Sequence, residues 1–372
     1  MLRNILMMLI TIHCALLHAG DYAQLQKLVA SDRGQNDNLG YSVSISGDYA
    51  IVGAYYEDED DNGANTVNGA GAAYIFKRSE GSWVQIKKLV AADRGGIYDQ
   101  FGISVSISGD YAIVGANYED EDAAGANTMN AAGAAYIFKA SQGGADNWGQ
   151  VKKLVAADRA GGEQFGYSVS ISGEYAIVGA PYKSNALGPN TLSQAGAAYV
   201  FKSSQGGADN WGQVKQLFAA DYESGDNFGN SVSISGEYAI VGACDENADA
   251  GAAYIFKSGQ GGVDNWGQVK KIVAAEREGN DRFGYSVSLS GEYAIVGAVY
   301  EKQDAAEANT LINAGSAYIF KVSQGGADNW GQIKKIVASD RAAGDFFGYA
   351  VSISGEYAIV GAMVEDEDET GA

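Results

Sequence analysis

A short segment with strictly alternating polar and apolar residues recurs along the chain. In residues 42–46 the order Ser-Val-Ser-Ile-Ser puts the apolar side chains on one side of the backbone, as in a half-buried β-strand. Ser46-Gly47-Asp48-Tyr49 then predicts a two-residue hairpin turn with glycine at its first central position, as a type II′ turn requires. Three further strands are predicted at Tyr49–Ala54, Ala73–Lys77 and Trp83–Ala91. No segment keeps helical periodicity for three turns.

This group of four segments is an internal repeat. The spacings between successive copies of the first two strands are 62, 64, 63, 55 and 64 residues. Four short strands repeated at this period are typical of the blades of a β-propeller, whereas the rungs of a β-helix repeat much sooner. We therefore expect an all-β propeller with four-stranded antiparallel blades. The six copies are at Ser42–Ala54, Ser104–Ala116, Ser168–Ala180, Ser231–Ala243, Ser286–Ala298 and Ala350–Ala362.

The two ends of the chain differ from the repeats. Residues 1–20 combine Arg3 with an apolar run at Ile5–Leu17 and small residues before Asp21, which predicts a secretory signal peptide. Residues 21–372 form the predicted propeller, beginning with a fourth strand at Gln24–Ala30. The sixth repeat stops before its third strand, so we expect a longer protein with at least one more strand and as many as seven blades. A six-bladed ring with a gap is the alternative.

Composition limits the possible chemistry. Both histidines and Cys14 lie in the predicted signal peptide, which leaves Cys244 as the only cysteine. Without histidine or a second cysteine, residues 21–372 cannot form a catalytic triad with histidine, a histidine-ligated zinc site or an internal disulfide. The net charge of −21 disfavours nucleic acid and anionic membranes and favours cations or a basic partner. No later segment is apolar enough for membrane insertion.

Two glycine-containing motifs accompany each repeat. A Phe-Gly pair precedes the first strand in five copies, Leu39-Gly40 takes its place in the first, and Gly-Ala ends every second strand. The Phe-Gly pairs are Phe101-Gly102, Phe165-Gly166, Phe228-Gly229, Phe283-Gly284 and Phe347-Gly348. The Gly-Ala glycines are Gly53, Gly115, Gly179, Gly242, Gly297 and Gly361.

These motifs resemble the FG-GAP repeat of the integrin alpha-chain propeller, over essentially all of residues 21–372. The resemblance implies a closed ring, usually of seven blades, that binds partners outside the cell. Integrin-type repeats often carry a calcium loop between the first two strands. Here that connection is Ser-Gly-Asp/Glu-Tyr in every copy. Since two residues cannot surround a calcium ion, the family's calcium sites are not transferred.

Acidic runs follow the second strand of several repeats. They are Glu57-Asp58-Glu59-Asp60-Asp61, Glu119-Asp120-Glu121-Asp122 and Glu365-Asp366-Glu367-Asp368-Glu369. The fourth repeat offers Asp245, Glu246 and Asp249, the fifth offers Glu301 and Asp304, and the third carries Lys183. One interpretation is a solvated acidic rim. The other is weak calcium binding or recognition of a basic partner, although consecutive carboxylates lack the ligand spacing of a dedicated calcium loop.

Other recurring residues suit packing better than chemistry. Asp-Arg or Glu-Arg follows most fourth strands, as in Asp93-Arg94, where neighbouring blades should join. The five tryptophans recur at one position, which indicates a core, with stacking on a sugar ring as the alternative. Cys244 is expected to be an unpaired thiol without functional weight.

The resulting hypothesis is a secreted binding or adhesion module whose variable acidic loops, on one propeller face, meet an extracellular protein, a glycan or a cation. A structural coat or matrix protein is one alternative. A carbohydrate-active propeller enzyme is another, but no repeat contributes a singular set of acid, base and aromatic residues. No catalytic residue is assigned, and calcium is the one cofactor considered.

Overall fold

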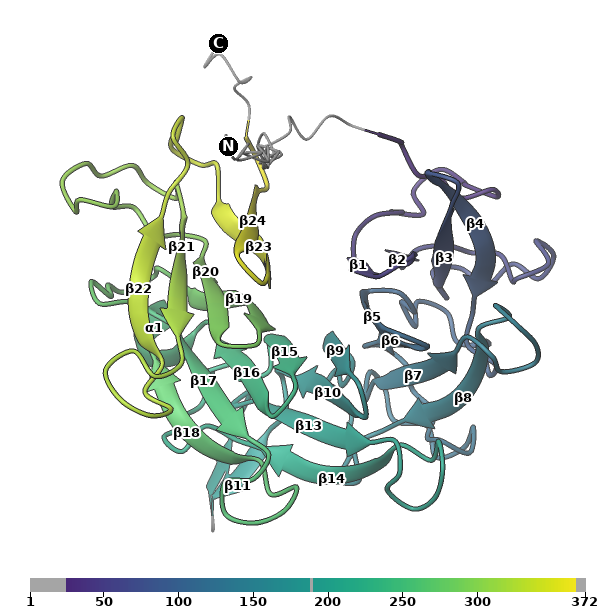
Figure 1. Cartoon of the computed structure of the whole chain (residues 1–372). Helices are drawn as coiled ribbons and strands as arrows, with labels where there is room; N and C mark the ends of the chain where they lie inside the picture. Colours follow the sequence, from purple (N-terminus) through teal and green to yellow (C-terminus); the bar gives the residue numbers. More distant parts are fainter. Residues whose placement is uncertain (1–24, 188–189, 366–372) are drawn as a thin grey trace, which may run out of the picture.

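The computed structural model describes residues 25–187 and 190–365, and its regular structure is almost entirely antiparallel β-sheet. Five sheets contain four strands each, and each of them is built by one sequence repeat. Figure 1 shows these blades side by side around a central axis, with the two-stranded sheet of the sixth repeat at one end of the ring. The predicted β-propeller is confirmed.

The strands are numbered along the chain. Blade 1 contains β1 (Val43–Ser46), β2 (Tyr49–Ala54), β3 (Ala72–Ser79) and β4 (Ser82–Leu89). Blade 2 contains β5 (Ser104–Ser108), β6 (Tyr111–Ala116), β7 (Ala134–Lys139) and β8 (Gly149–Leu154). Blade 3 contains β9 (Ser168–Ser172), β10 (Tyr175–Ala180), β13 (Ala197–Lys202) and β14 (Gly212–Leu217). Blade 4 contains β15 (Ser231–Ser235), β16 (Tyr238–Ala243), β17 (Ala252–Lys257) and β18 (Gly267–Ile272). Blade 5 contains β19 (Phe283–Ser290), β20 (Tyr293–Ala298), β21 (Ser316–Lys321) and β22 (Gly331–Ile336). The sixth repeat forms β23 (Phe347–Ser354) and β24 (Tyr357–Ala362).

The first hairpin of each blade has the predicted turn. Ser46 pairs with Tyr49 across β1 and β2, so the turn contains only Gly47 and Asp48. Gly47 has a φ of 58° and Asp48 has no positive φ, which fits a type II′ turn.

The apolar core lies between neighbouring blades. Ile51 and Ile75 of blade 1 pack against Val105, Ile107 and Tyr136 of blade 2, and each of these side chains is at most 8% exposed. Equivalent clusters join blades 2 to 3, 3 to 4 and 4 to 5. Because burying one Val or Ile side chain contributes roughly 1.5–3 kcal/mol, each interface between blades supplies a large share of the stability.

The glycine motifs lie where two blades come closest. A Cβ added to Gly53 of blade 1 would lie 2.0 Å from the carbonyl oxygen of Gly102, which precedes blade 2. Gly102 itself has a φ of 94°, which disfavours any other residue. The Ser42 hydroxyl donates to the same carbonyl oxygen at 2.8 Å. The backbone contact therefore explains why both positions carry glycine in the repeats that follow.

The two ends of the ring expose surfaces that are buried elsewhere. Ile45 of β1 is 66% exposed, whereas its counterpart Ile107 in β5 is 4% exposed. Ile359 of β24 is 71% exposed, whereas its counterpart Ile51 in β2 is fully buried. The outer side of blade 1 and the outer side of the β23–β24 sheet thus have no blade packed against them among the described residues.

The expected fourth strand at the start of the propeller does not form. Residues 25–30 adopt no strand. They lie beside blade 1, where the Gln26 side chain exchanges two 2.8 Å hydrogen bonds with the backbone of Trp83. A fourth strand needs a third strand as its hydrogen-bonding partner, and none is described next to this segment. The predicted signal peptide, residues 1–20, and Gln24 lie outside the described residues.

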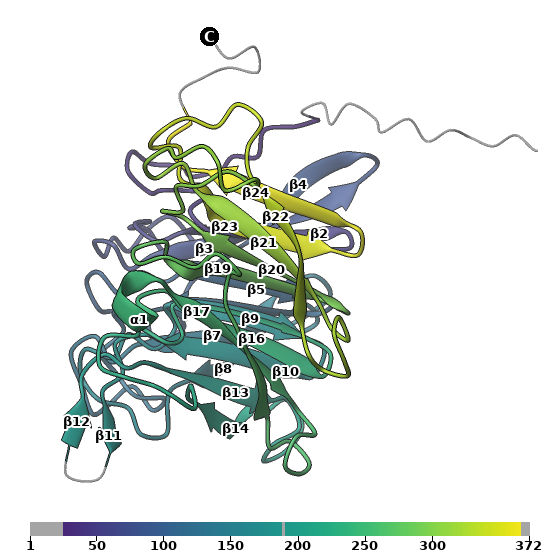
Figure 2. The ribbon, with the colours of Figure 1, turned by 90° about the vertical axis from the view of Figure 1, so that its left-hand side faces the viewer.

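The loops between strands separate the two faces of the ring. Figure 2 shows the turns of β3–β4 and β23–β24 on one face, which we call the turn face. The opposite face carries the longer acidic loops after each second strand and the linkers between blades, and we call it the loop face. It includes α1 (Glu246–Asp249) and an unexpected hairpin of β11 (Asn185–Leu187) and β12 (Asn190–Leu192). Within the described residues no helix is long and apolar enough to cross a bilayer.

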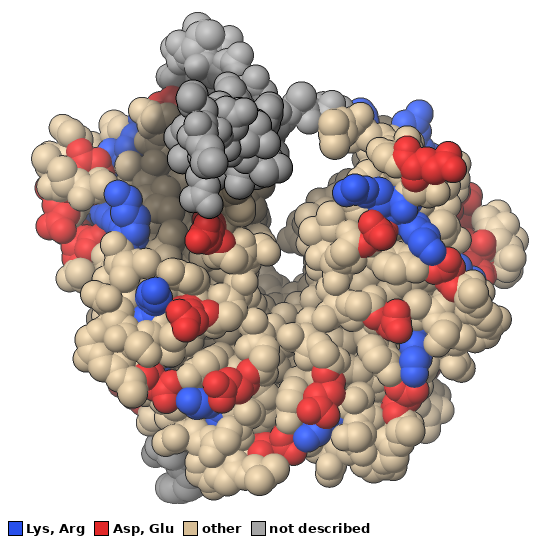
Figure 3. Space-filling model, in the orientation of Figure 1, with Lys and Arg blue, Asp and Glu red and all other residues tan. Residues whose placement is uncertain are grey.

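The turn face repeats one contact from blade to blade. The Tyr49 hydroxyl donates to Asp146 of the next blade, and Lys77 Nζ lies 2.7 Å from the same carboxylate. The Tyr49 ring also contacts Trp148, with ring centroids 5.2 Å apart. Figure 3, which views the turn face, shows acidic and basic side chains lying in pairs around the ring. The same Tyr-Asp-Lys set recurs at Tyr111, Asp209 and Lys139, at Tyr175, Asp264 and Lys202, and at Tyr238, Asp328 and Lys257.

Candidate functional site

The first acid of the acidic loop in blade 2 is buried. Glu119 is 4% exposed, and its Oε2 accepts a 2.9 Å hydrogen bond from the Tyr136 hydroxyl. Lys153 Nζ lies 3.2 Å from Glu119 Oε1 and 2.6 Å from Oδ2 of Asp93, which belongs to the linker before blade 2. We call Asp93, Glu119, Tyr136 and Lys153 the charge network of this blade. It ties the acidic loop, the linker and the third and fourth strands together.

The charge network recurs around the ring. Blade 1 contains Asp32, Glu57, Tyr74 and Lys88, with Glu57 2% exposed. Blade 5 contains Glu276, Glu301, Tyr318 and Lys335, with Glu301 1% exposed. A solvated rim is therefore wrong for these glutamates, since each is neutralised in the interior of the protein.

Blade 3 builds the network with exchanged charges. Lys183 takes the loop position of Glu119, and Gln216 takes the fourth-strand position of Lys153. Lys183 Nζ lies 2.7 Å from Glu163 Oε1 and 3.1 Å from Asp158 Oδ2. Gln216 donates to Asp158 and to the Tyr199 hydroxyl, both at 3.0 Å. The buried positive charge thus moves from the strand to the loop and still faces carboxylates.

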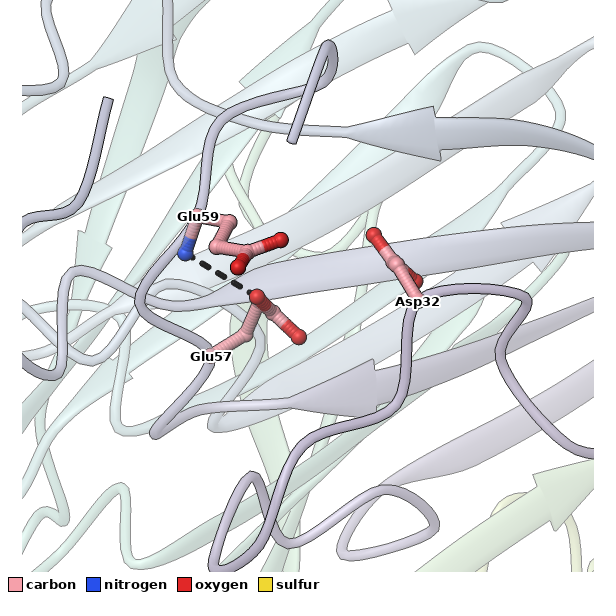
Figure 4. A group of neighbouring side chains, drawn as sticks. All are labelled: Asp32, Glu57 and Glu59. Atoms are coloured by element: carbon pink, nitrogen blue, oxygen red, sulfur yellow. Dashed lines mark hydrogen bonds between the residues drawn. The ribbon is translucent and has the colours of Figure 1, made fainter. Parts of the chain in front are cut away.

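Blades 1 and 2 each bring three acidic side chains together, as a calcium site would require. Figure 4 shows Asp32, Glu57 and Glu59, which offer three carboxylate oxygens within 4.8 Å of one another, and Asp93, Glu119 and Glu121 do the same. Lys88 Nζ lies 2.7 Å from Asp32 and 3.2 Å from Glu57. Because calcium takes six to eight oxygens and would have to displace this ammonium group, the residues present do not fit a dedicated calcium site.

Other acids of the loops hold the loops in shape. Asp58 accepts from the backbone N–H of Gly69 at 2.7 Å, and Asp120 accepts from Ala131 in the same way. Asp60 accepts from the backbone N–H groups of Ala64 and Asn62, and these bonds lower the pKa of Asp60 to about 2. Asp122 and Asp304 fold their loops with equivalent bonds.

The remaining predicted acids are more scattered. Asp245 lies 3.2 Å from the Arg282 guanidinium. Glu246 lies 2.9 Å from Lys271 Nζ, which is also 2.6 Å from Asp221, so Glu246 belongs to the blade 4 counterpart of the charge network. Asp249 ends α1. Glu59, Asp61 and Glu121 are half-buried or exposed. Glu365 ends the described part of the chain, and Asp366, Glu367 and Asp368 lie outside it. The structure therefore does not gather these acids into one site.

The Asp-Arg pairs join neighbouring blades, with each member serving a different blade. Asp93 binds Lys153 of blade 2, whereas Arg94 donates to the backbone carbonyl oxygens of Asn65 and Asp58 in the acidic loop of blade 1. Arg159 and Arg341 bind the preceding acidic loops in the same way.

A different set of residues forms an open cavity of about 620 Å³ on the loop face, around the central axis. We call it the tyrosine cup. It is lined by residues from all six repeats, placed directly beside the Phe-Gly and Gly-Ala motifs. Its aromatic side chains are Tyr41, Tyr55, Tyr56, Tyr118, Tyr167, Tyr182, Tyr285 and Tyr349. Four amides also line it, from Gln100, Asn117, Gln164 and Asn230.

The rings of the cup contact one another in pairs. Tyr41 and Tyr55 have ring centroids 4.6 Å apart, and Tyr285 and Tyr349 have centroids 5.2 Å apart. Tyr167 meets Tyr182 edge to face at 6.1 Å. Burial raises the pKa of Tyr182, so its hydroxyl remains a neutral donor and acceptor at physiological pH.

One amide of the cup is buried with an unsatisfied atom. Asn117 is 2% exposed, and its Nδ2 donates to Gln164 Oε1 at 3.0 Å. Its Oδ1 has no hydrogen-bond partner among the described residues. An unpaired buried acceptor costs about 1–3 kcal/mol, which a new hydrogen-bond donor would recover only after the side chain exposes this oxygen.

The tryptophans do not belong to the cup. Trp148, Trp211, Trp266 and Trp330 are at most 1% exposed and lie on the turn-face side, against tyrosines of the preceding blade. Stacking of these four rings on a sugar is therefore ruled out. Cys244 is free and buried.

The family model of the FG-GAP repeat matches the chain six times, at residues 22–76, 83–138, 148–201, 211–256, 266–320 and 330–372. The chain belongs to the FG-GAP repeat family. Each of its five four-stranded blades and its two-stranded sixth sheet falls largely within one of these matches.

Comparison with other proteins adds little to this assignment. No curated protein matches this FG-GAP sequence. Among solved structures, the hydrazine synthase of Kuenenia stuttgartiensis is similar with a TM-score of 0.49 and 11% identity, covering 87% of this chain and 84% of that one. A protein from Lactobacillus plantarum is similar with a TM-score of 0.43 and 12% identity, covering 80% and 71%. Likenesses this distant carry no functional argument.

The FG-GAP repeats vary at the cup as well as in the acidic loops, and both kinds of variation are visible in the sequence. The residue after each Phe-Gly or Leu-Gly pair is Tyr41, Ile103, Tyr167, Asn230, Tyr285 or Tyr349. The residue after each Gly-Ala pair is Tyr55, Asn117, Pro181, Cys244, Val299 or Met363. The acidic runs do not point to these positions, but variation next to an otherwise constant motif marks them.

Proposed function

We propose that this FG-GAP protein is a secreted binding or adhesion module whose loop face contacts an extracellular ligand. The observation that carries the proposal is the contrast between the two faces. The turn face uses one Tyr-Asp-Lys contact in blade after blade, and that contact joins neighbouring blades. The loop face instead carries different residues at equivalent positions, on a rigid scaffold, which is how binding surfaces are usually built.

Several features support binding over catalysis. The buried glutamates of the acidic loops are held by lysine and tyrosine, so they lack the free carboxylate pair that glycoside hydrolysis uses. The acids that remain more exposed, such as Asp61 and Glu121, leave the rim of the loop face negative, which favours a neutral or basic ligand.

An adhesion assay tests the proposal. The full chain is expressed in a secreting host, and the protein in the medium is sequenced from its N-terminus, where we expect a start near Asp21. Beads coated with the secreted protein are then scored for attachment to cells of the species of origin. We expect attachment by the wild type and a clear loss with Tyr56→Ala/Tyr118→Ala, whose side chains are 36% and 40% exposed on the loop face.

Glu174→Ala/Glu237→Ala is the matched control on the turn face, because both carboxylates are largely exposed and make only 3.9 Å contacts with lysine. The proposal fails if the turn-face variant abolishes attachment while the loop-face variant does not. It also fails if the protein is retained inside the cell or if no attachment occurs.

A further inference from the structure

The tyrosine cup is uncharged in a strongly acidic protein. Its fourteen lining residues are eight tyrosines, four amides, Ile103 and Met363, and none of these described residues carries a charge. The whole chain has a net charge of −21. A charged ligand would lose its hydrating water on entering the cup and would meet no opposite charge among these residues. The free-energy cost of this desolvation would weaken its binding. The lining therefore suits a neutral ligand.

The lining combines flat apolar surfaces with groups that both donate and accept hydrogen bonds. Tyrosine rings such as Tyr118 and Tyr182 present apolar faces, and their hydroxyls donate and accept. The side-chain amides of Gln100, Gln164 and Asn230 do the same at their two ends. A ligand that matches both features has C–H faces to pack on rings and several hydroxyls to share with amides.

Asn117 adds an independent observation. It lines the cup, is 2% exposed and has an Oδ1 without a partner among the described residues. This oxygen can only accept a hydrogen bond and is closed off from solvent, so a donor such as a hydroxyl reaches it after a small rotation of the side chain toward the cup. The cavity of about 620 Å³ also lies within the range of about 300–1,000 Å³ that is usual for small-molecule sites.

From these observations we propose that the tyrosine cup binds a neutral carbohydrate, such as the end of a glycan chain. Sugar rings pack on the tyrosine side chains, and sugar hydroxyls bond to the amides, with Asn117 Oδ1 joining once its side chain turns toward the cup. The proposal rests on the binding function proposed above and names the ligand class of that face.

The test is titration of the purified full chain with four neutral trisaccharides, namely maltotriose, cellotriose, chitotriose and mannotriose, up to about 10 mM, a range that detects dissociation constants of about 1 mM. Tetramethylammonium is titrated in parallel as a probe for a cationic ligand. We expect at least one sugar to bind, with affinity reduced about tenfold or more by Tyr118→Ala and by Tyr182→Ala.

Tyr98→Ala is the control, because Tyr98 is an exposed tyrosine of the loop face that does not line the cup. Its affinity for the sugar should equal that of the wild type, and thermal melts establish that all three variants are folded. Equal sugar affinity in the cup variants and the wild type overturns the proposal, as does binding of tetramethylammonium without any sugar.

Failure of the whole sugar panel also overturns the carbohydrate proposal. If the coated beads still attach to cells in that case, the binding function stands and only the ligand class is wrong. If neither sugars nor cells bind, both proposals fail.

Discussion

Lys153 Nζ of blade 2 lies 3.2 Å from Glu119 Oε1, and both side chains are 5% exposed. Transfer of two charges into the interior is costly, and their attraction compensates only while both partners and their hydrogen bonds are present. Blade 3 keeps this balance with Lys183 and Gln216 at the two positions. The charge network is therefore a property of the whole set of residues, and a single replacement should be far more damaging than an exchange.

Replacing Lys153 with glutamine should destabilise the protein by about 3–5 kcal/mol, because Glu119 and Asp93 are left without their ammonium group. The double variant Lys153→Gln/Glu119→Lys copies blade 3 and should lose less than the sum of its two single variants, with a coupling of about 1–3 kcal/mol. Urea unfolding at neutral pH gives these differences.

Lys152→Gln serves as the control, since among the described residues Lys152 bonds Asn210 at 3.0 Å and is not part of the network. It should cost less than about 1 kcal/mol. Strict additivity of the Lys153 and Glu119 replacements would show that the two residues are not coupled.

Two isoleucines in identical sequence surroundings should respond differently to truncation. Ile107 and Ile45 both occupy the second apolar position of Ser-Val-Ser-Ile-Ser, but Ile107 is 4% exposed and Ile45 is 66% exposed. Ile107→Ala should cost about 2–5 kcal/mol, as for other buried isoleucines, and Ile45→Ala should cost less than about 1 kcal/mol. Thermal and urea unfolding of the pair measure the difference. Similar losses in both variants would mean that a surface covers β1 in solution.

This pair also shows what sequence patterns can and cannot predict. Alternation and turn residues were sufficient to place the strands, because backbone geometry and turn chemistry are local. They could not distinguish Ile45 from Ile107, because burial depends on which blade lies next to the strand. The prediction of a fourth strand at Gln24–Ala30 was wrong for a related reason. A strand forms only beside a pairing partner, and the sequence of the segment does not determine that partner.

The candidate site was harder to predict than the fold. The exchange of Lys183 and Gln216 is visible in the sequence, but only the blade geometry shows that the two positions are neighbours. The sequence shows that the acidic runs are charged, but it does not show which of their side chains are buried. Glu119 is buried against Lys153, so it stabilises the blade and is not open to a ligand. The tyrosines of the cup are far apart along the chain and converge only when the ring places each blade around the axis.

Stability should be highest at mildly acidic pH. Burial, with Glu119 and Asp120 nearby, raises the pKa of Asp99 to about 7, and burial with Glu301 nearby raises the pKa of Asp281 to about 7. A carboxyl group whose folded pKa is raised binds its proton more tightly in the folded state, so stability falls as pH rises from about 4 to 7. Since one pKa unit corresponds to about 1.4 kcal/mol, unfolding at about pH 5 should require a few kcal/mol more than at about pH 8.

The opposite behaviour is expected below this range. Lys139 and Tyr111 hold the pKa of Asp209 below its ordinary value, so the stability from this group is present above about pH 4 and is lost as pH falls further. Asp281→Asn should reduce the dependence between about pH 5 and 8 by roughly half, because Asp99 still contributes, whereas Asp209→Asn should leave it intact and lower stability at neutral pH. A stability that rises steadily from about pH 5 to pH 8 would contradict the buried neutral carboxyls.

Calcium should stabilise a variant of the protein more than the wild type. In the wild type, Lys153 lies against Asp93 and Glu119 and occupies the place that a cation would take. Thermal melts in about 2 mM calcium, in magnesium and in excess EDTA should therefore show no calcium-specific shift, although a ligand at about a hundredfold its dissociation constant stabilises by about 2.7 kcal/mol.

Lys153→Gln frees Asp93, Glu119 and Glu121, whose oxygens lie within 4.8 Å of one another, so calcium should restore part of the stability that this variant has lost. A calcium-specific rise in the wild type would instead mean that the ion displaces lysine, and the acidic loops would then be metal sites.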